Sequence, residues 1–254
     1  MGIDVSREGH VTVVRFARPE KLNALTLKMY EDLGRAFDEA QEDGDVHCIA
    51  LLGSEKAFSV GADLLESIPA LASGRFDISE WDGAHLKRGN VFKPIVSGIR
   101  GMCFGGGFEI MLATDVRIAG RNAFFQLPEA RHGFVPAGGT LVRLVRQIAY
   151  AHAMEIMLTA RQFTALEMAE RGVVNEIVDD DCVDSRALEV AGRIAAFSPR
   201  VTQTIKEAAL TLQDLPLPQA FAREAALGQR TFASPEAIAA LEKFAARKRT
   251  GSPG

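Results

Sequence analysis

Two glycine-bearing segments are the parts of this chain best suited to hold a developing negative charge. Residues 58–64 and 101–110 each follow a short apolar stretch typical of a strand and lead into an apolar stretch that fits a helix. The first N–H groups of a helix lack partners within it, and the helix dipole favours negative charge there. The two segments therefore predict a pair of backbone donors of the oxyanion-hole type.

The glycines themselves fit this interpretation better than the common phosphate-binding motifs. Gly105, Gly106 and Gly107 would each cost a helix up to about 1 kcal/mol relative to alanine, so another group must approach this backbone closely. Tight packing of a helix on a strand explains one such glycine but not three. The chain has no G-x-G-x-x-G turn here, no G-K-[ST] ending and no G-x-S-x-G elbow.

Glu109 is the most informative single residue, because its neighbours Phe108, Ile110 and Met111 are apolar. A carboxylate buried in such a helix is costly unless it is paired or used. The alternative, an exposed acid that complements the helix dipole, is weakened by the expected burial. Glu129 lies in a loop after a proline, where solvation or pairing with a neighbour is the ordinary outcome. Two carboxyl groups in different segments can together handle a proton and a water if the fold brings them together.

Other polar residues carry less weight as functional candidates. His132 has no partner at metal-ligand spacing, so a structural role is favoured, and no metal site is expected. The acidic run 179–181 fits a solvated turn better than a cation site. Phe76, Trp81 and His85 fall in the irregular stretch 66–92, where they either line a pocket or cover the core.

Around these residues, the sequence predicts an α/β core followed by a helical C-terminal region. We expect a hairpin over 3–16, a helix from Leu27 that Thr26 caps and Gly44 ends, and a capping box at Thr164–Glu167. Further helices are expected over 182–196, after a cap at Ser198, and after a cap at Ser234. Strands are expected at 46–52, 94–99, 116–119 and 173–178. The predicted division is a core over 1–195 and a helical region over 196–254.

Composition excludes several classes of function. The 254 residues are 47% hydrophobic and 24% charged, and 29 basic against 33 acidic residues give a net charge of −4. A nucleic-acid partner is not expected from this balance. No apolar run is long enough to span a membrane. The three cysteines are too few for a disulfide framework, and we expect Cys48 and Cys103 to be buried. The opening residues have no targeting pattern, so we expect a cytoplasmic protein.

Taken in order, these segments resemble the crotonase superfamily, also called the enoyl-CoA hydratase/isomerase family. The resemblance implies a crotonase-like spiral of ββα units with a C-terminal helical trimerisation region that also covers the active site. It further implies a homotrimer or a dimer of trimers. The segments that carry it are 18–25, 58–64, 105–109, 126–133, 136–140 and 244–249.

The resemblance also implies a role for individual residues. The backbone N–H groups of Ala62 and Gly106 would form the oxyanion hole that polarises a thioester carbonyl. Glu109 and Glu129 match the two catalytic carboxylates of the hydratases. Coenzyme A would arrive as part of the substrate, with no separate cofactor. The residues expected to bind CoA or substrate are Lys21, Ala24, Ala62, Asp63, Leu64 and Gly106.

The function that the resemblance favours is a lyase of fatty-acid β-oxidation, which adds water to a 2-trans-enoyl-CoA to give a 3-hydroxyacyl-CoA. An enoyl-CoA isomerase is the alternative, and it would need Glu129 but tolerate Glu109→Gln. A third hypothesis is an acyl-CoA-binding protein without turnover. The identity of the acyl group stays open, because the sequence departs from the family pattern at two places. Val60 stands where the family usually has a smaller residue, and the Pro136–Gly139 turn is one residue tighter than usual.

Overall fold

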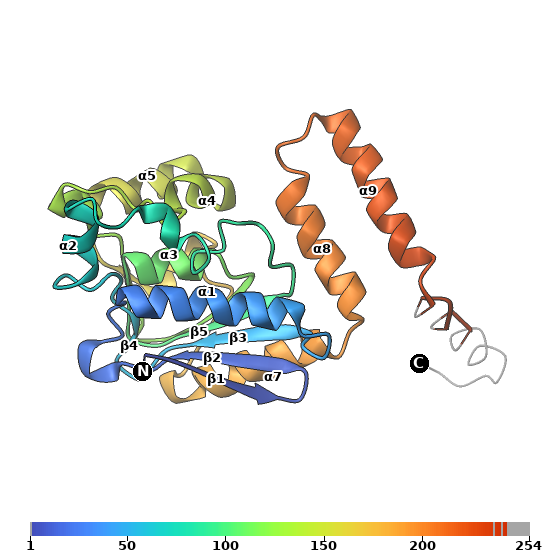
Figure 1. Ribbon diagram of the computed structural model, residues 1–254, viewed down its shortest axis with the longest axis horizontal. Coiled ribbons are helices and arrows are strands. Elements are labelled where there is room, and N and C mark those ends of the chain that lie inside the picture. Colours follow the sequence, from blue (N-terminus) through green and yellow to red (C-terminus); the bar gives the residue numbers. More distant parts are fainter. Residues whose placement is uncertain (1, 236, 240, 243–254) are drawn as a thin grey trace. The chain divides into compact units, whose positions relative to one another are not determined.

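Figure 1 shows the computed structural model, which describes residues 2–235, 237–239 and 241–242. The chain forms two compact units that divide between Ala195 and Ala196. The first unit is a mixed α/β structure. The second contains helices α8 (Pro199–Thr211) and α9 (Leu217–Phe232). No helix in the described part of the chain is both long and apolar enough to cross a membrane.

A six-stranded sheet forms the centre of the first unit, in the order β1-β2-β3-β5-β7-β10. The first two strands form the predicted antiparallel hairpin, and every later neighbour pairs in parallel. The strands are β1 (Ile3–Glu8), β2 (Val11–Phe16), β3 (Cys48–Leu52), β5 (Ile95–Ile99), β7 (Val116–Gly120) and β10 (Glu176–Val178).

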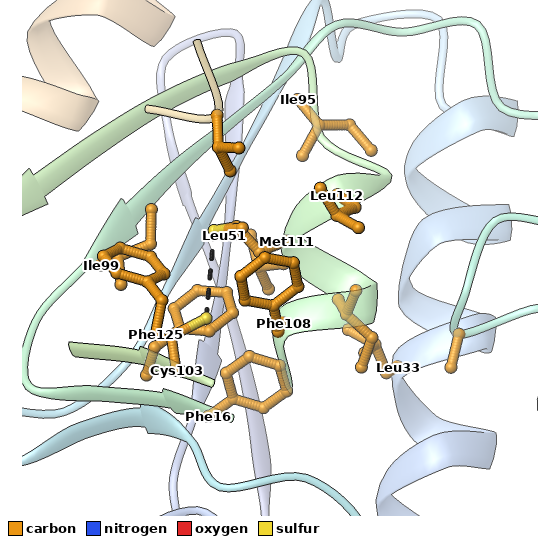
Figure 2. Packing of buried hydrophobic residues seen from close by; sticks show 14 of the residues in the cluster. Phe16, Leu33, Leu51, Ile95, Ile99, Cys103, Phe108, Met111, Leu112 and Phe125 are labelled. Atoms are coloured by element: carbon orange, nitrogen blue, oxygen red, sulfur yellow. Dashed lines mark hydrogen bonds between the residues drawn. The ribbon is translucent and has the colours of Figure 1, made fainter. Parts of the chain in front are cut away.

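The central strands β3 and β5 are buried on both faces, whereas β1 is mostly exposed. Alternate side chains of each strand point to opposite sides of the sheet. In β3, Ile49 and Leu51 enter the larger hydrophobic cluster with helices α1 (Leu27–Glu42) and α3 (Gly106–Leu112). Figure 2 shows this cluster, with Phe108 and Met111 of α3 packed near Leu51. The other three β3 side chains, those of Cys48, Ala50 and Leu52, pack with α7 (Val183–Ala195) in a second cluster.

A second, four-stranded sheet holds the glycine-bearing segments and was not predicted. Its order is β4-β6-β8-β9, with the first three strands parallel and the last pair antiparallel. Helix α3 begins at Gly106, directly after β6, and α2 (Ser67–Ala72) follows the segment after β4. The strands are β4 (Ala57–Ser59), β6 (Met102–Phe104), β8 (Phe124–Gln126) and β9 (Phe163–Thr164).

Most of the predicted element boundaries are confirmed. The Thr26 hydroxyl caps α1 by accepting a 3.2 Å hydrogen bond from Met29 N–H, and the capping box of α6 (Ala165–Glu170) is present. The Ser234 hydroxyl likewise accepts from Ala237 N–H. Helices α4 (Thr140–Gln147) and α5 (Tyr150–Thr159) complete the first unit. The cysteines behave as expected, with Cys48 and Cys103 buried as free thiols.

Two local expectations are wrong. The strand predicted over 173–178 covers only its last three residues, because Val173 N–H and Val174 N–H turn back to the Met168 carbonyl instead of joining the sheet. Ser198 stands at the N-terminus of α8, but its hydroxyl makes no capping bond, and its carbonyl accepts from Val201 and Thr202 instead. The segment 244–249, which carries part of the family resemblance, lies outside the described residues.

Candidate active site

One cavity of about 740 Å³ in the first unit brings most of the predicted site residues together. Ala62 and Leu64 line it from the segment after β4, and Gly106 and Glu109 line it from the first turn of α3. Glu129 reaches it from the segment after β8. Backbone donors and two carboxyl groups from three separate segments therefore face one cavity.

Main-chain pairing fixes the segment that carries Ala62. Leu25 N–H donates to the Gly61 carbonyl at 2.8 Å, and Asp63 N–H donates to the Leu25 carbonyl at 2.9 Å. The fully buried Asn23 holds the loop before Leu25, because its amide donates to the Ala57 and Phe58 carbonyls at 2.9 and 3.1 Å. Asn23 has a left-handed backbone (φ 56°), a conformation that asparagine tolerates better than most residues.

The two predicted oxyanion donors lie beside each other because the residue before Ala62 is a glycine. Gly61 has φ +86°, and a Cβ at this position would stand only 2.7 Å from Gly106 N. A larger residue would therefore push the segment away from the start of α3. Among the described residues, neither Ala62 N–H nor Gly106 N–H donates to a protein acceptor. Both groups remain able to bind an anionic oxygen.

Glu109 is buried, as the sequence predicted, with 6% of its surface exposed. Its Oε1 accepts a 2.7 Å hydrogen bond from Gly138 N–H, which orients the carboxyl group in the cavity. Burial raises the pKa of Glu109 to about 8, and the charge of Glu129 acts in the same direction. Hydrogen bonding from Thr140 and from Gly138 N–H lowers the pKa of Glu109, but desolvation is the larger effect.

Glu129 opens a 3₁₀ helix, Glu129–His132, and is only partly exposed. Its Oε2 is buried and has no hydrogen-bond partner among the described residues. Burial raises the pKa of Glu129 to about 7. Because both carboxyl groups lose their protons near neutral pH, one can serve as an acid while the other serves as a base.

The four other predicted binding residues differ in their surroundings. The Asp63 carboxylate binds Arg18 at 2.6 Å and accepts from Leu65 N–H, so it holds the loop together, and Arg18 keeps the pKa of Asp63 below its usual range. Leu64 is exposed and lines the cavity. Lys21 is exposed, and Ala24 accepts from Arg18 through its carbonyl. Lys21, Ala24 and Asp63 do not line the cavity itself.

The less strongly predicted residues also divide into those that line the cavity and those that do not. Phe76, Trp81 and His132 line the cavity, whereas His85 is buried and does not line it. In the acidic run 179–181, Asp179 pairs with Arg121 and Asp180 accepts from Asn122. The described residues contain no group of three side chains placed to hold a metal ion.

Asn23 and Tyr30 are among the residues of the site that the sequence did not reveal. Asn23 positions the loop, and the only sequence feature that could have identified it is its place in the segment 18–25, which carries part of the family resemblance. Tyr30 lines the cavity from α1, yet its spacing with Leu27, Leu33 and Phe37 marked it as a core residue of that helix. The only sequence feature that distinguished Tyr30 from a core residue was its hydroxyl group on an otherwise apolar face of the helix.

Comparison with known proteins gives the site a context. The family model described as enoyl-CoA hydratase/isomerase matches residues 6–250. Enoyl-CoA hydratase EchA19 of Mycobacterium tuberculosis is 34% identical over 249 residues, which cover 96% of this chain and 93% of that protein. Mevalonyl-coenzyme A hydratase SIDH of Beauveria bassiana is 35% identical over 202 residues, which cover 75% and 71%.

A solved structure shows the same fold. The crystal structure of an enoyl-CoA hydratase from Bacillus anthracis superposes with a TM-score of 0.86 at 27% sequence identity. The match covers 97% of this chain and 97% of that one. The observed sheets and helices are therefore those of the crotonase fold.

Proposed function

This chain belongs to the enoyl-CoA hydratase/isomerase family, and from that premise we propose that it is an enoyl-CoA hydratase, a lyase that adds water to a 2-trans-enoyl-CoA to form a 3-hydroxyacyl-CoA. The observation that carries the proposal is the pair of buried carboxyl groups, Glu109 and Glu129, with pKa values raised to about 8 and about 7, in the cavity that Ala62 and Gly106 also line.

The reaction needs an acid, a base and a place for negative charge. When a hydroxyl group adds to Cβ of the enoyl thioester, electrons move through Cα to the carbonyl oxygen. The N–H groups of Ala62 and Gly106 would bind that oxygen, and losing one such donor typically costs 10²- to 10³-fold in rate. One carboxylate takes the proton of the water, and the other, as a carboxylic acid, gives a proton to Cα. One shared proton on the pair is sufficient.

The names of the relatives support hydration over isomerisation, because both curated relatives described above are called hydratases. Their names differ in the acyl group, so the family does not define the substrate of this chain beyond the CoA thioester. For the CoA part we assign Lys21 and Ala24, which lie on the loop that pairs with the Ala62 segment. The exposed ammonium group of Lys21 suits a phosphate of the nucleotide.

The first test mixes the purified protein with crotonyl-CoA and follows the loss of the conjugated-thioester absorbance. Mass spectrometry of the product should show the gain of one water. Glu109→Gln and Glu129→Gln should each lower kcat by on the order of 10²- to 10⁴-fold, because each removes one proton-transferring group. Glu55→Gln, in an exposed loop, is the matched control and should behave as the wild type.

The other outcomes separate the alternatives. Movement of the double bond without gain of water, retained in Glu109→Gln but lost in Glu129→Gln, would show an isomerase. Tight acyl-CoA binding with no change in short, longer or branched enoyl-CoAs would show a binding protein. Either result would reject hydration.

A further inference from the structure

We propose that the Tyr30 hydroxyl is a third hydrogen-bond donor to the thioester oxygen, beside the N–H groups of Ala62 and Gly106. This inference rests on the proposed function, because it concerns the oxyanion of the same reaction. It adds a side chain to a site otherwise assigned to backbone groups alone.

The first observation is that the Tyr30 hydroxyl has no partner in the protein. Only 2% of the residue is exposed, and its oxygen forms no hydrogen bond with any described residue. Buried tyrosine hydroxyls usually find a partner, since an unsatisfied one costs free energy. A donor left unpaired at the wall of a ligand cavity indicates that the ligand supplies the acceptor.

The second observation is where this hydroxyl lies. A Cβ added to Gly106 would stand 2.6 Å from the Tyr30 hydroxyl oxygen and 3.6 Å from Ala62 N. The hydroxyl and the Ala62 N–H therefore flank the same point beside the first residue of α3. Glycine at position 106 is what leaves room for the phenol next to the two backbone donors.

The third observation is that the phenol ring is held in place. Tyr30 stacks on Trp81 with ring centroids 4.1 Å apart and planes 12° from parallel, and the His85 ring lies 5.5 Å away. Tyr30 comes from the core face of α1, whose N-terminus is capped by Thr26. A donor fixed by such packing needs little reorganisation during the reaction, which is the condition for strong stabilisation of an oxyanion.

The charge state agrees with the role of a donor. Burial raises the pKa of Tyr30 well above its usual value, and the negative charges of Glu109 and Glu129 act in the same direction. The phenol therefore keeps its proton throughout the pH range in which the two carboxyl groups titrate. The same charges show that the hydroxyl lies in the electrostatic field of both carboxyl groups.

The test replaces Tyr30 by phenylalanine, which keeps the ring and its stacking and removes only the hydroxyl. Tyr150→Phe is the matched control, because Tyr150 is the other tyrosine of the chain and is 70% exposed. The first readout is the infrared carbonyl band of bound butyryl-CoA carrying ¹³C at the thioester carbon, a saturated ligand that cannot be hydrated. The second is kcat and KM for crotonyl-CoA, and the third is the melting temperature without ligand.

We expect the carbonyl band of the Tyr30→Phe complex at higher frequency than in the wild type, because one hydrogen bond to the oxygen is missing. We expect kcat to fall by on the order of 10²-fold with KM little changed, since the bond strengthens as the enolate forms. The melting temperature should stay the same or rise, because no protein hydrogen bond is lost. Tyr150→Phe should match the wild type in all three readouts.

An unchanged carbonyl band overturns the inference. If kcat also falls, the hydroxyl acts on the water instead; if the melting temperature falls, the hydroxyl is structural. The two proposals can also fail separately. Suppose that the wild-type protein hydrates no enoyl-CoA, but that its bound butyryl-CoA shows a lowered carbonyl frequency that Tyr30→Phe raises again. This result would reject the proposed reaction and keep the role of Tyr30 in binding the thioester oxygen.

Discussion

At the scale of single residues, burial explains the chemistry of the site. Glu109 and Glu129 have ordinary carboxyl groups, and desolvation moves both of their pKa values toward neutrality. The sequence allowed the burial of Glu109 to be predicted, because its neighbours along the helix are apolar. It could not give the same result for Glu129, since the burial of a loop residue depends on segments far away in the chain.

The raised pKa of Glu109 predicts a pH-dependent stability that is independent of the reaction. Below about pH 4.5 both the folded and the unfolded chain hold the proton; between 4.5 and about 8 only the folded chain does. The folded state therefore loses stability relative to the unfolded state as pH rises through this window, by about 5 kcal/mol, and the loss levels off above it.

Glu109→Gln should remove the part of this slope that Glu109 contributes, should keep the part that Glu129 contributes below about pH 7, and should be more stable than the wild type above about pH 8. The amide oxygen can still accept from Gly138 N–H, so the local geometry is kept. Urea unfolding of both proteins at several pH values measures the effect, with Glu55→Gln as the control that keeps the wild-type slope. Parallel stability curves for Glu109→Gln and wild type would contradict it.

At the scale of elements, the first turn of α3 is the junction on which the site depends. Gly106 begins the helix, contributes an N–H to the cavity and leaves space for the Tyr30 hydroxyl, while Glu109 follows one turn later. The short strands β4 and β6 place the two glycine-bearing segments side by side. The helix and its two flanking segments therefore act as one unit of the active site.

Gly106→Ala should destabilise the protein by about 1–3 kcal/mol, because the new methyl group collides with the Tyr30 hydroxyl oxygen. The cost should be smaller in a Tyr30→Phe background, where that oxygen is missing. Urea unfolding of the two single variants and the double variant measures this coupling. Gly192→Ala, in α7, is the control: its Cβ meets no atom within 4 Å, so this variant should gain stability. Equal costs of Gly106→Ala in both backgrounds would show that the clash is not with Tyr30.

The same elements show why the sequence predicted one sheet and missed the other. Strands such as β3 and β5 are five residues long and mostly apolar, so composition alone reveals them. Strands β4 and β6 have three residues each, which is too short to show a periodic pattern, and β6 is flanked by glycines. Tyr30 is a similar case, since helical spacing gave its burial but not the direction of its hydroxyl.

At the scale of the whole molecule, the second unit presents apolar side chains that a folded chain normally covers. In α9, Leu217, Phe221 and Phe232 are each at least 60% exposed. Large apolar groups exposed along one helix mark an interaction surface. We therefore predict that identical chains assemble through this helix, as the homotrimer or dimer of trimers that the resemblance implies.

Sedimentation equilibrium of the full chain should therefore give three or six times the mass of one chain. Introducing Phe221→Asp and Phe232→Asp together should shift the distribution toward single chains, because charged groups would have to be buried in the interface. Glu224→Gln, an exposed change in the same helix, should leave the mass unaltered. A single-chain mass for the wild type would reject the assembly.

Strand β3 has a consequence for how this chain can vary. Its five side chains are all buried, three against α7 and two against the cluster that holds α3. A polar substitution at any position of β3 would disturb one of the two hydrophobic clusters. The segments after the strands are bound to the frame mainly through backbone pairing and a few anchors such as Asn23. Evolution can therefore exchange cavity-lining residues such as Val60, and with them the acyl group accepted, while the frame that aims the donors stays the same.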